Sequence, residues 1–287
     1  MNSDYLQTGF RIFAMLLFAL VLVANLYADF KLKDIDVVVF ARDEPLVEET
    51  ISFYINTTES LNEYKTSPIA RNDLEAWVKR TSLNDIRQHF NPEVANISEF
   101  IILPQETKYS AAEGSYYSSV KIQYIAHRYY NGTAALPDTG IFTVAQSKPR
   151  IKEYVLNENA LNFGSGFGGD AVLGENVRLT LQLPKEAQGI YFSIDPSDVV
   201  PSDFTLGSDG KKQYIGDERT FYWTHTRLPS FTVKYYIELP LQEEIRQAVD
   251  SIANRVVLIF TGKDSLSAAV LVAAILVSAY AILKVKK

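Results

Sequence analysis

The segment from residue 162 to residue 169 reads NFGSGFGG, and Gly164, Gly166 and Gly169 match the G-x-G-x-x-G spacing of a dinucleotide phosphate cradle. Such a cradle needs a helix after the glycines, because the N–H groups and dipole of the helix N-terminus bind the anion. The residues that follow, AVLGENVRLTLQLP, instead predict a turn and a strand with period-two alternation. We therefore expect a loop that needs glycine, and no nucleotide site.

Aspartates recur between residues 195 and 209, beside prolines, serines and a glycine. Asp195, Asp198 and Asp203 are the candidate metal ligands, because carboxylate oxygens are the ligands that Ca²⁺ prefers. Their spacing matches no EF-hand loop, and aspartate before proline or serine is also ordinary in turns. Calcium is the one cofactor that the sequence leaves open.

No constellation of nucleophile and base is recognisable along the chain. The three histidines, His89, His127 and His225, share no ligand spacing such as H-E-x-x-H, and no serine lies in G-x-S-x-G. Cysteine is absent, which excludes disulfides, a thiolate zinc site and a cysteine nucleophile. We predict no catalytic residue and a non-enzymatic protein. An exported hydrolase that uses paired carboxylates or calcium is an alternative, since the sequence does not show which acidic side chains converge.

Aromatic residues recur in adjacent positions, and neighbours on a strand point to opposite faces. One member of each doublet should therefore face away from the core, where it could stack on a sugar or contact a protein. Trp223 and Tyr236 are the binding candidates, and cross-strand packing is the alternative role. The doublets are Tyr116-Tyr117, Tyr129-Tyr130, Phe221-Tyr222-Trp223 and Tyr235-Tyr236.

Two uncharged apolar runs flank the body of the chain, IFAMLLFALVLVANLY at residues 12–27 and SLSAAVLVAAILVSAYAIL at residues 265–283. Each is near the shortest length that spans a hydrocarbon core of about 30 Å. We predict an N-terminal transmembrane anchor within residues 1–28 and a C-terminal transmembrane helix within residues 265–287. The first run also fits a secretory signal with a poor cleavage site.

The charge distribution predicts the orientation. Lys284, Lys286 and Lys287 directly follow the second run, so the positive-inside rule places the C-terminus in the cytosol. Two spans then place both termini in the cytosol of a cell-membrane protein and residues 29–264 outside it. The chain carries a net charge of −6 despite this basic tail, so the body is acidic and nucleic acid is an unfavourable partner.

Three N-glycosylation sequons begin at Asn56, Asn96 and Asn131. They are the glycosylation candidates of an exported body. Their number is no higher than composition alone produces, so they do not argue for export.

Strand patterns with short helices predict a β-rich domain over residues 29–148. The expected strands are residues 35–40, 47–55, 99–103, 116–130 and 141–144. Asn72 is expected to cap a short helix that contains Trp77, and Ser82 a second one that contains Ile86 and Phe90. Asn131-Gly132 is a hairpin-type turn.

Beyond Lys148-Pro149-Arg150, the candidate boundary, the pattern is almost purely β. Short strands separated by Gly, Pro and Asp predict an immunoglobulin-like β-sandwich over residues 149–240. The expected strands are residues 177–183, 190–194, 214–215, 219–225 and 231–237. Residues 241–264 predict an amphipathic juxtamembrane helix and a connector to the second span.

The sequence thus predicts a mainly β protein with an α+β N-terminal part, a two-domain extracytosolic body and two transmembrane helices. We expect a structural, accessory or binding component of the cell surface. Its partners would be the bilayer and a protein of the membrane or envelope, with neither nucleic acid nor nucleotide. Glycan binding by exposed aromatics is an alternative function.

Overall fold

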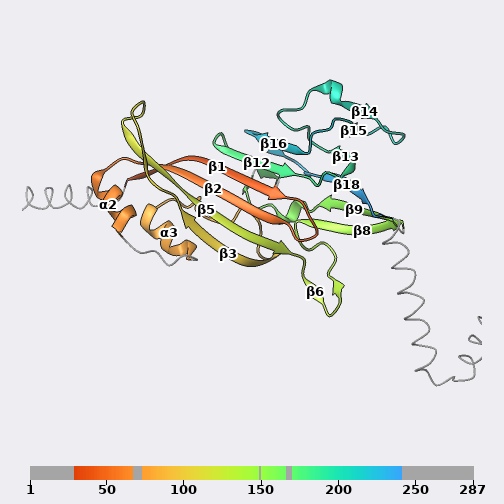
Figure 1. Cartoon of the computed structure of the whole chain (residues 1–287), viewed down its shortest axis with the longest axis horizontal. Helices are drawn as coiled ribbons and strands as arrows, with labels where there is room; N and C mark the ends of the chain where they lie inside the picture. The colour runs from red at the N-terminus through yellow and green to blue at the C-terminus, as the bar shows by residue number, and fades with distance from the viewer. Residues whose placement is uncertain (1–28, 67–72, 149, 166–169, 241–287) are drawn as a thin grey trace, which may run out of the picture. The chain divides into compact units, whose positions relative to one another are not determined.

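The computed structural model describes residues 29–66, 73–148, 150–165 and 170–240 (Figure 1). The fold is mainly β, as the sequence predicts, and the described part contains two α-helices. The chain divides into two compact units. The first comprises residues up to 143 together with residues 154–235, and the second comprises residues 144–153 and the residues from 236 onward.

A seven-stranded sheet forms the larger layer of the first unit, in the order β16-β12-β1-β2-β5-β3, and β4 also pairs with β5. Period-two burial builds it: in β2, every second residue from Val47 to Ile55 is buried and the residues between are half-buried. β1 pairs with β12 in parallel, with Val37 opposite Leu179, and the other pairings in this sheet are antiparallel. The strands are β1 (Phe30–Phe40), β2 (Leu46–Ile55), β3 (Asn96–Pro104), β4 (Lys108–Ser110), β5 (Ser115–His127), β12 (Val177–Gln182) and β16 (Thr220–Thr224).

Two helices lie at the end of this sheet where β1 begins, α2 (Thr58–Thr66) and α3 (Leu74–Thr81) (Figure 1). Asp73 caps α3, since its side chain accepts a hydrogen bond from the Ala76 N–H. The expected cap Asn72 lies outside the described residues. Buried Trp77 and the Tyr64 ring of α2, with centroids 6.0 Å apart, join the helices to each other.

The second helix expected from Ser82 does not form. Ser82 ends α3 in the left-handed conformation, with φ at 57°, and its N–H donates to the Val78 carbonyl. Ile86 and Phe90 are nevertheless fully buried, in an irregular segment. The helix expected to contain these two residues is therefore wrong, and they enter the core from an irregular backbone.

A four-stranded sheet has the order β13-β18-β9-β8. Its strands are β8 (Phe142–Lys148), β9 (Ile151–Leu156), β13 (Gln188–Phe192) and β18 (Val233–Glu238). The smaller elements are β6 (Tyr130–Asn131) with β7 (Ala134–Ala135), η1 (Glu158–Ala160), β10 (Gly164–Ser165) with β11 (Ala171–Val172) and β17 (Arg227–Leu228), η2 (Pro201–Asp203), and β14 (Phe204–Leu206) with β15 (Lys212–Tyr214).

Within the first unit, aromatic side chains fill the core between β13 and the large sheet. Phe192 of β13 contacts Phe221 of β16, with ring centroids 4.7 Å apart, and Trp223 contacts Phe231 at 5.0 Å. Trp223 is fully buried, and its indole N–H donates to the Ile194 carbonyl at 3.0 Å. The inner faces of the sheets therefore meet as in a β-sandwich.

The sandwich does not follow the expected division at residues 148–150. Strands β12 and β16, which belong to the segment expected to form its own sandwich, extend the sheet that β1 and β2 begin. The alternation of apolar residues specifies which face of a strand is buried, but it does not specify which strand lies next to it in the sheet. Within the second unit, Arg150 and Glu238 form an ion pair at 3.0 Å.

None of the helices described is long and apolar enough to cross a membrane. Both expected spans and the expected juxtamembrane helix of residues 241–264 lie outside the described residues.

Candidate functional site

At the end of the large sheet where β1 begins, four tyrosines and two lysines lie in two cross-strand rows. In the first row, Ile55 of β2 pairs with Tyr116 of β5, which pairs with Tyr109 of β4. In the second row, Lys31, Tyr54, Tyr117 and Lys108 lie opposite one another on β1, β2, β5 and β4. We call these residues the tyrosine–lysine rim: Lys31, Tyr54, Lys108, Tyr109, Tyr116 and Tyr117.

Four rim residues are exposed, Tyr54 and Tyr117 are half-buried, and cations lie over two of the rings. Tyr109 is 58% exposed and Tyr116 38%, and their ring centroids lie 5.1 Å apart. The Lys65 ammonium lies 5.7 Å from the Tyr116 ring, and that of Lys33 lies 5.3 Å from the Tyr117 ring. These cation–π contacts hold positive charge beside large amphipathic side chains.

Gln105 and Glu106 line two hollows of about 450 and 460 Å³, and the smaller one is also lined by Lys108 and Tyr117 of the rim. Below them, the Tyr64 hydroxyl donates to the Gln105 carbonyl at 2.7 Å and accepts from the Ser118 hydroxyl at 2.8 Å. Burial raises the pKa of Tyr64, while these two hydrogen bonds oppose the shift. A neutral hydroxyl with both partners satisfied ties α2 to the sheet and has no obvious catalytic use.

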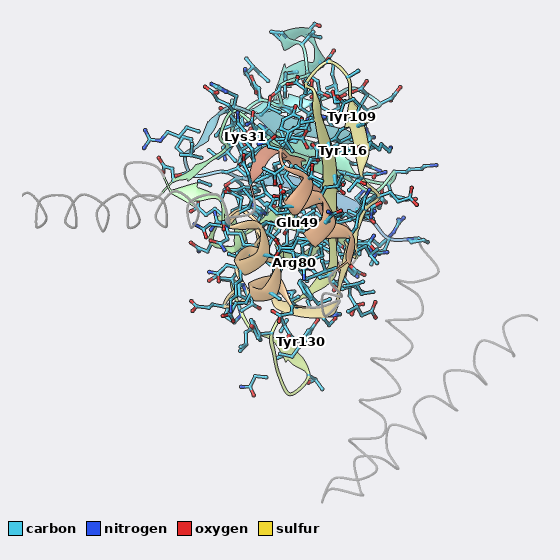
Figure 2. All side chains as sticks on the ribbon, turned by 90° about the vertical axis from the view of Figure 1, so that its left-hand side faces the viewer. Lys31, Glu49, Arg80, Tyr109, Tyr116 and Tyr130 are labelled. Carbon is cyan, nitrogen blue, oxygen red and sulfur yellow. The ribbon has the colours of Figure 1, made fainter. Side chains whose placement is uncertain are left out.

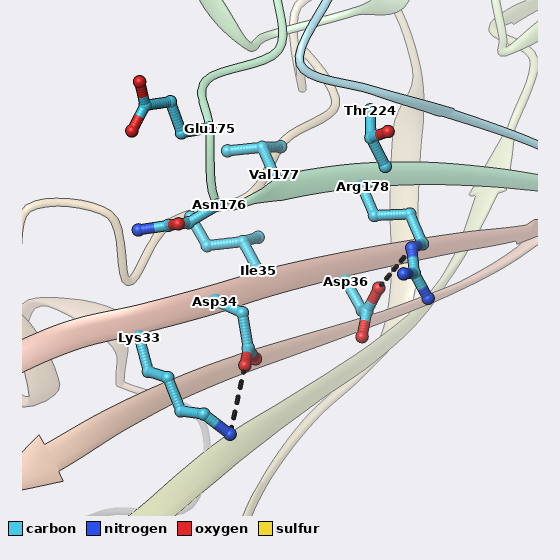
Figure 3. Close-up of a pocket in the computed structure, with 9 residues that line it drawn as sticks. All are labelled: Lys33, Asp34, Ile35, Asp36, Glu175, Asn176, Val177, Arg178 and Thr224. Carbon is cyan, nitrogen blue, oxygen red and sulfur yellow. Dashed lines mark ion pairs between the residues drawn. The ribbon is translucent and has the colours of Figure 1, made fainter. Parts of the chain in front are cut away.

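A third hollow, of about 320 Å³, opens where the parallel pairing of β1 with β12 starts (Figure 3). Asp34 and Asp36 project into it from β1. The Lys33 ammonium lies 3.4 Å from Asp34, and the Arg178 Nε lies 3.7 Å from Asp36. Burial raises the pKa of Asp36, Arg178 counteracts the rise, and Asp34 adds to it. Each aspartate thus has its own cation, which is typical of a solvated ion-pair network.

A buried polar cluster lies on the inner face of the same sheet. Glu49 Oε1 accepts hydrogen bonds from the His89 backbone N–H at 2.9 Å and the Tyr124 hydroxyl at 2.5 Å, and Oε2 lies 2.8 Å from His89 Nδ1. All three residues are at most 2% exposed, and Phe163 lies against His89 with ring centroids 5.3 Å apart. Burial, and then Glu49, raise the pKa of Tyr124 well above its usual value. This geometry could orient a histidine for base catalysis, but substrate does not reach it.

The two candidate binding aromatics differ in their exposure. Trp223 is fully buried in the sandwich core, so its ring is not available to a sugar or a protein, and Tyr236 is half-buried. The outward member of the run Phe221-Tyr222-Trp223 is Tyr222, and the Arg178 guanidinium lies 5.2 Å from its ring centroid. The aromatics that protrude furthest in the described part, Tyr109 and Tyr130, were not among the candidates.

The aspartates considered as calcium ligands do not converge. Asp195 pairs with the Lys212 ammonium at 2.8 Å. No group of three or more acidic or histidine side chains in the described ranges is arranged to hold a metal ion, so Asp195, Asp198 and Asp203 form no such group. Asp209, nearby, accepts a hydrogen bond from the Lys211 N–H, which is ordinary turn chemistry.

The remaining candidates lie at the surface or in loops. Asn56, Asn96 and Asn131 are all exposed. Gly164 begins the two-residue strand β10, Gly166 and Gly169 lie outside the described residues, and residues 170–182 contain two strands and no helix.

A sequence signal could have revealed one of the two missed sites. Glu49 occupies an apolar position of the period-two pattern that Val47 and Ile51 define, where an acidic residue needs buried partners. Tyr116-Tyr117 was a recognised doublet, but its pairing with Tyr54 and Lys108 depends on strand register, which no local pattern specifies.

Comparison with known proteins does not identify a function for this site. No family model matches the sequence, and no curated protein matches it significantly. Among solved structures, the chain is similar to the folded domain of LppM from Mycobacterium tuberculosis, with 10% sequence identity and a TM-score of 0.22, over 75% of this chain and 94% of that domain. At that TM-score the likeness carries no argument.

Proposed function

We propose that this chain is a membrane-anchored, extracytosolic and non-enzymatic binding component of the cell surface, which contacts a protein partner through the outer face of its large sheet. The observation that carries the proposal is a pair of exposed aliphatic side chains on β3, Ile101 at 42% and Leu103 at 38% exposure. Exposed apolar side chains that adjoin one another on a sheet are typical of protein contacts.

The outer face is the side of the sheet opposite buried Ile102 and Ile122. Ile101 lies opposite Gln123, and Leu103 lies opposite Lys121. Glu48 of β2 accepts from Gln123 at 2.5 Å and pairs with the Lys121 ammonium at 2.8 Å. Because these polar groups already have partners, a docking protein would desolvate fewer unpaired groups next to the aliphatic pair.

The backbone of β3 favours contact through side chains over addition of a strand. β3 is a terminal strand of the sheet, with a register shift between Ser98 and Ile101 and a positive φ of 52° at Glu99. Pro104 ends the strand and lacks an N–H. Bulges and prolines are devices that prevent edge strands from pairing with other chains.

Two arrangements favour binding over catalysis. The Glu49–His89 pair is sealed in the core. The two aspartates that share a hollow, Asp34 and Asp36, each have a cation beside them, whereas paired-carboxylate hydrolysis needs one free acid and one free base.

Photo-crosslinking in the native membrane tests the proposed contact. A photoreactive residue at Ile101 or Leu103 of the full chain should give the same discrete adduct. Thr220, which is exposed on β16 at the other edge of the sheet, is the matched control and should give none. Adducts of equal yield at all three positions, or at none, would contradict the proposal.

The proposed orientation has its own test. Protease added to intact cells should cleave the body and leave a tag fused after Lys287 intact. Digestion of that tag with an untouched body would reverse the orientation.

A further inference from the structure

The tyrosine–lysine rim lies close to the first apolar run along the chain. The run ends at Tyr27 and β1 begins at Phe30, so three residues span at most about 11 Å. The start of the body is fixed, because the Asp29 N–H donates to the Ser60 hydroxyl at 2.8 Å and the Asn56 N–H donates to the Asp29 carbonyl at 3.1 Å. If residues 12–27 are in the bilayer, this end of the sheet is adjacent to it.

We propose that the rim is a membrane-docking surface that lies among the phospholipid headgroups of the leaflet where the first apolar run emerges. The inference rests on the membrane anchoring proposed above. Tyrosine is enriched at membrane interfaces because its ring is apolar and its hydroxyl polar, and lysine extends its ammonium to the headgroups. The rim has both residue types, side by side.

The side chains of the rim are arranged for such contact. Figure 2 looks onto this end of the sheet and shows Tyr109 and Tyr116 together at the surface, with Lys31 at a similar level. Tyr109 belongs to β4 and Tyr116 to β5, so the hairpin that joins these strands carries both rings. Lys65 adds a cation from α2 beside Tyr116.

Charges of both signs surround the rim, and they determine which part of a lipid headgroup it can contact. Asp29, Glu106 and Glu113 are exposed close to its lysines along the chain. The lysines therefore make no strongly cationic patch that would need an anionic membrane. They fit the phosphate that all phospholipids share, and the docking orients the body while the apolar run supplies the attachment.

Docking would set the height of the proposed partner surface. From Tyr117 in the rim to Gln123, which is opposite Ile101, β5 rises by six residues, or about 20 Å. The rim would therefore hold Ile101 and Leu103 about 20 Å from the headgroups if β5 stands upright.

The absence of cysteine allows a direct test with single labels. The full chain with Ala112→Cys, an exposed position in the turn between β4 and β5 that leaves every rim side chain in place, carries a fluorophore in phosphatidylcholine vesicles that contain a lipid with a nitroxide on its headgroup. Leu206→Cys, 76% exposed on the β14–β15 hairpin, is the matched control. Quenching at 112 should exceed quenching at 206 at least about threefold, since the hairpin that carries the rim tyrosines lies at headgroup depth.

Leu20→Cys, in the apolar run, separates the two proposals. If nitroxide on the acyl chain quenches the label at 20 while the labels at 112 and 206 respond equally to the headgroup nitroxide, the rim does not dock and the anchor stands. If the label at 20 is also unquenched, the first run is outside the bilayer, and both the docking of the rim and anchoring by this run fail.

Discussion

The buried Glu49 cluster and the tyrosine–lysine rim lie on one sheet and use similar side chains, yet their environments differ completely. In the cluster, Glu49 and Tyr124 are fully buried and form hydrogen bonds to each other. In the rim, Tyr109 is 58% exposed and lies beside another tyrosine ring. Polar groups in the first setting have no water to replace a lost partner, whereas those in the second do.

The difference assigns the two regions to different tasks. Losing a partner from the cluster leaves the others buried and unsatisfied, so the cluster should determine stability. Losing a rim side chain exposes the neighbours to water at little cost, so the rim is free to serve binding.

Glu49→Ala should have the largest effect of the substitutions considered. It removes the acceptor for the His89 N–H, His89 Nδ1 and the Tyr124 hydroxyl. Breaking a buried, hydrogen-bonded charge cluster costs roughly 3–5 kcal/mol in the free energy of unfolding. Urea denaturation of the full chain in detergent, followed by tryptophan fluorescence, measures it, because both tryptophans, Trp77 and Trp223, are buried in the first unit.

Glu48→Ala is the matched control for that change. Glu48 is the adjacent residue of β2, but its side chain is 23% exposed and pairs with Lys121 on the outer face. Its loss should cost at most about 1 kcal/mol. Equal effects of the two substitutions would remove the distinction between the faces.

Tyr124→Phe should have an intermediate effect. It deletes one hydroxyl and leaves Glu49 Oε1 with the His89 backbone N–H as a donor. A lost hydrogen bond to a buried charged group costs about 1.5–3 kcal/mol. The same denaturation assay measures it, and a cost near zero would show that the 2.5 Å contact contributes no net stability.

Much of this sandwich could be predicted from its sequence, because burial on one face leaves a period-two pattern. Strands β1, β2, β5 and β12 overlap the expected ones. What the pattern omits is the partner of each strand, and the parallel pairing of β12 with β1 depends on contacts that are distant along the chain.

Helices and site residues were harder to predict for local reasons. α2 was not expected, because its sequence, TESLNEYKT, contains few apolar residues. Ser82 is of a type that is common at N-caps, yet it occupies the left-handed C-cap position. In β16 the doublet rule was right that one neighbour faces outward, but the burial of Phe221 and Trp223 together leaves Tyr222 as that residue.

Alkaline pH should lower the free energy of unfolding through the buried cluster, by less than the substitutions above. Tyr124 has a raised pKa in the folded protein, so its contribution to stability is present below about pH 10 and is lost as the unfolded chain ionises above that pH. Stability should decline by about 1.4 kcal/mol per pH unit more steeply in the parent chain than in Tyr124→Phe. Urea denaturation of both between pH 9 and 11 measures the difference, and the other buried tyrosines contribute equally to both.

Parallel slopes for the two chains would mean that Tyr124 ionises equally well when folded, and hence that the cluster is accessible to water. That outcome would also weaken the contrast with the rim.

Tyr109→Ser should have the smallest effect on stability and a clear effect on docking. The side chain is 58% exposed, and its ring contact with Tyr116 is the interaction that is lost. An exposed substitution of this kind changes the free energy of unfolding by about 0.5 kcal/mol or less. If the rim lies among headgroups, the same variant should reduce headgroup quenching of a label at Ala112→Cys, because one of the two exposed tyrosine rings of the rim no longer enters the interface. A large loss of stability with unchanged quenching would reverse the assignment, making Tyr109 a structural residue like those of the cluster.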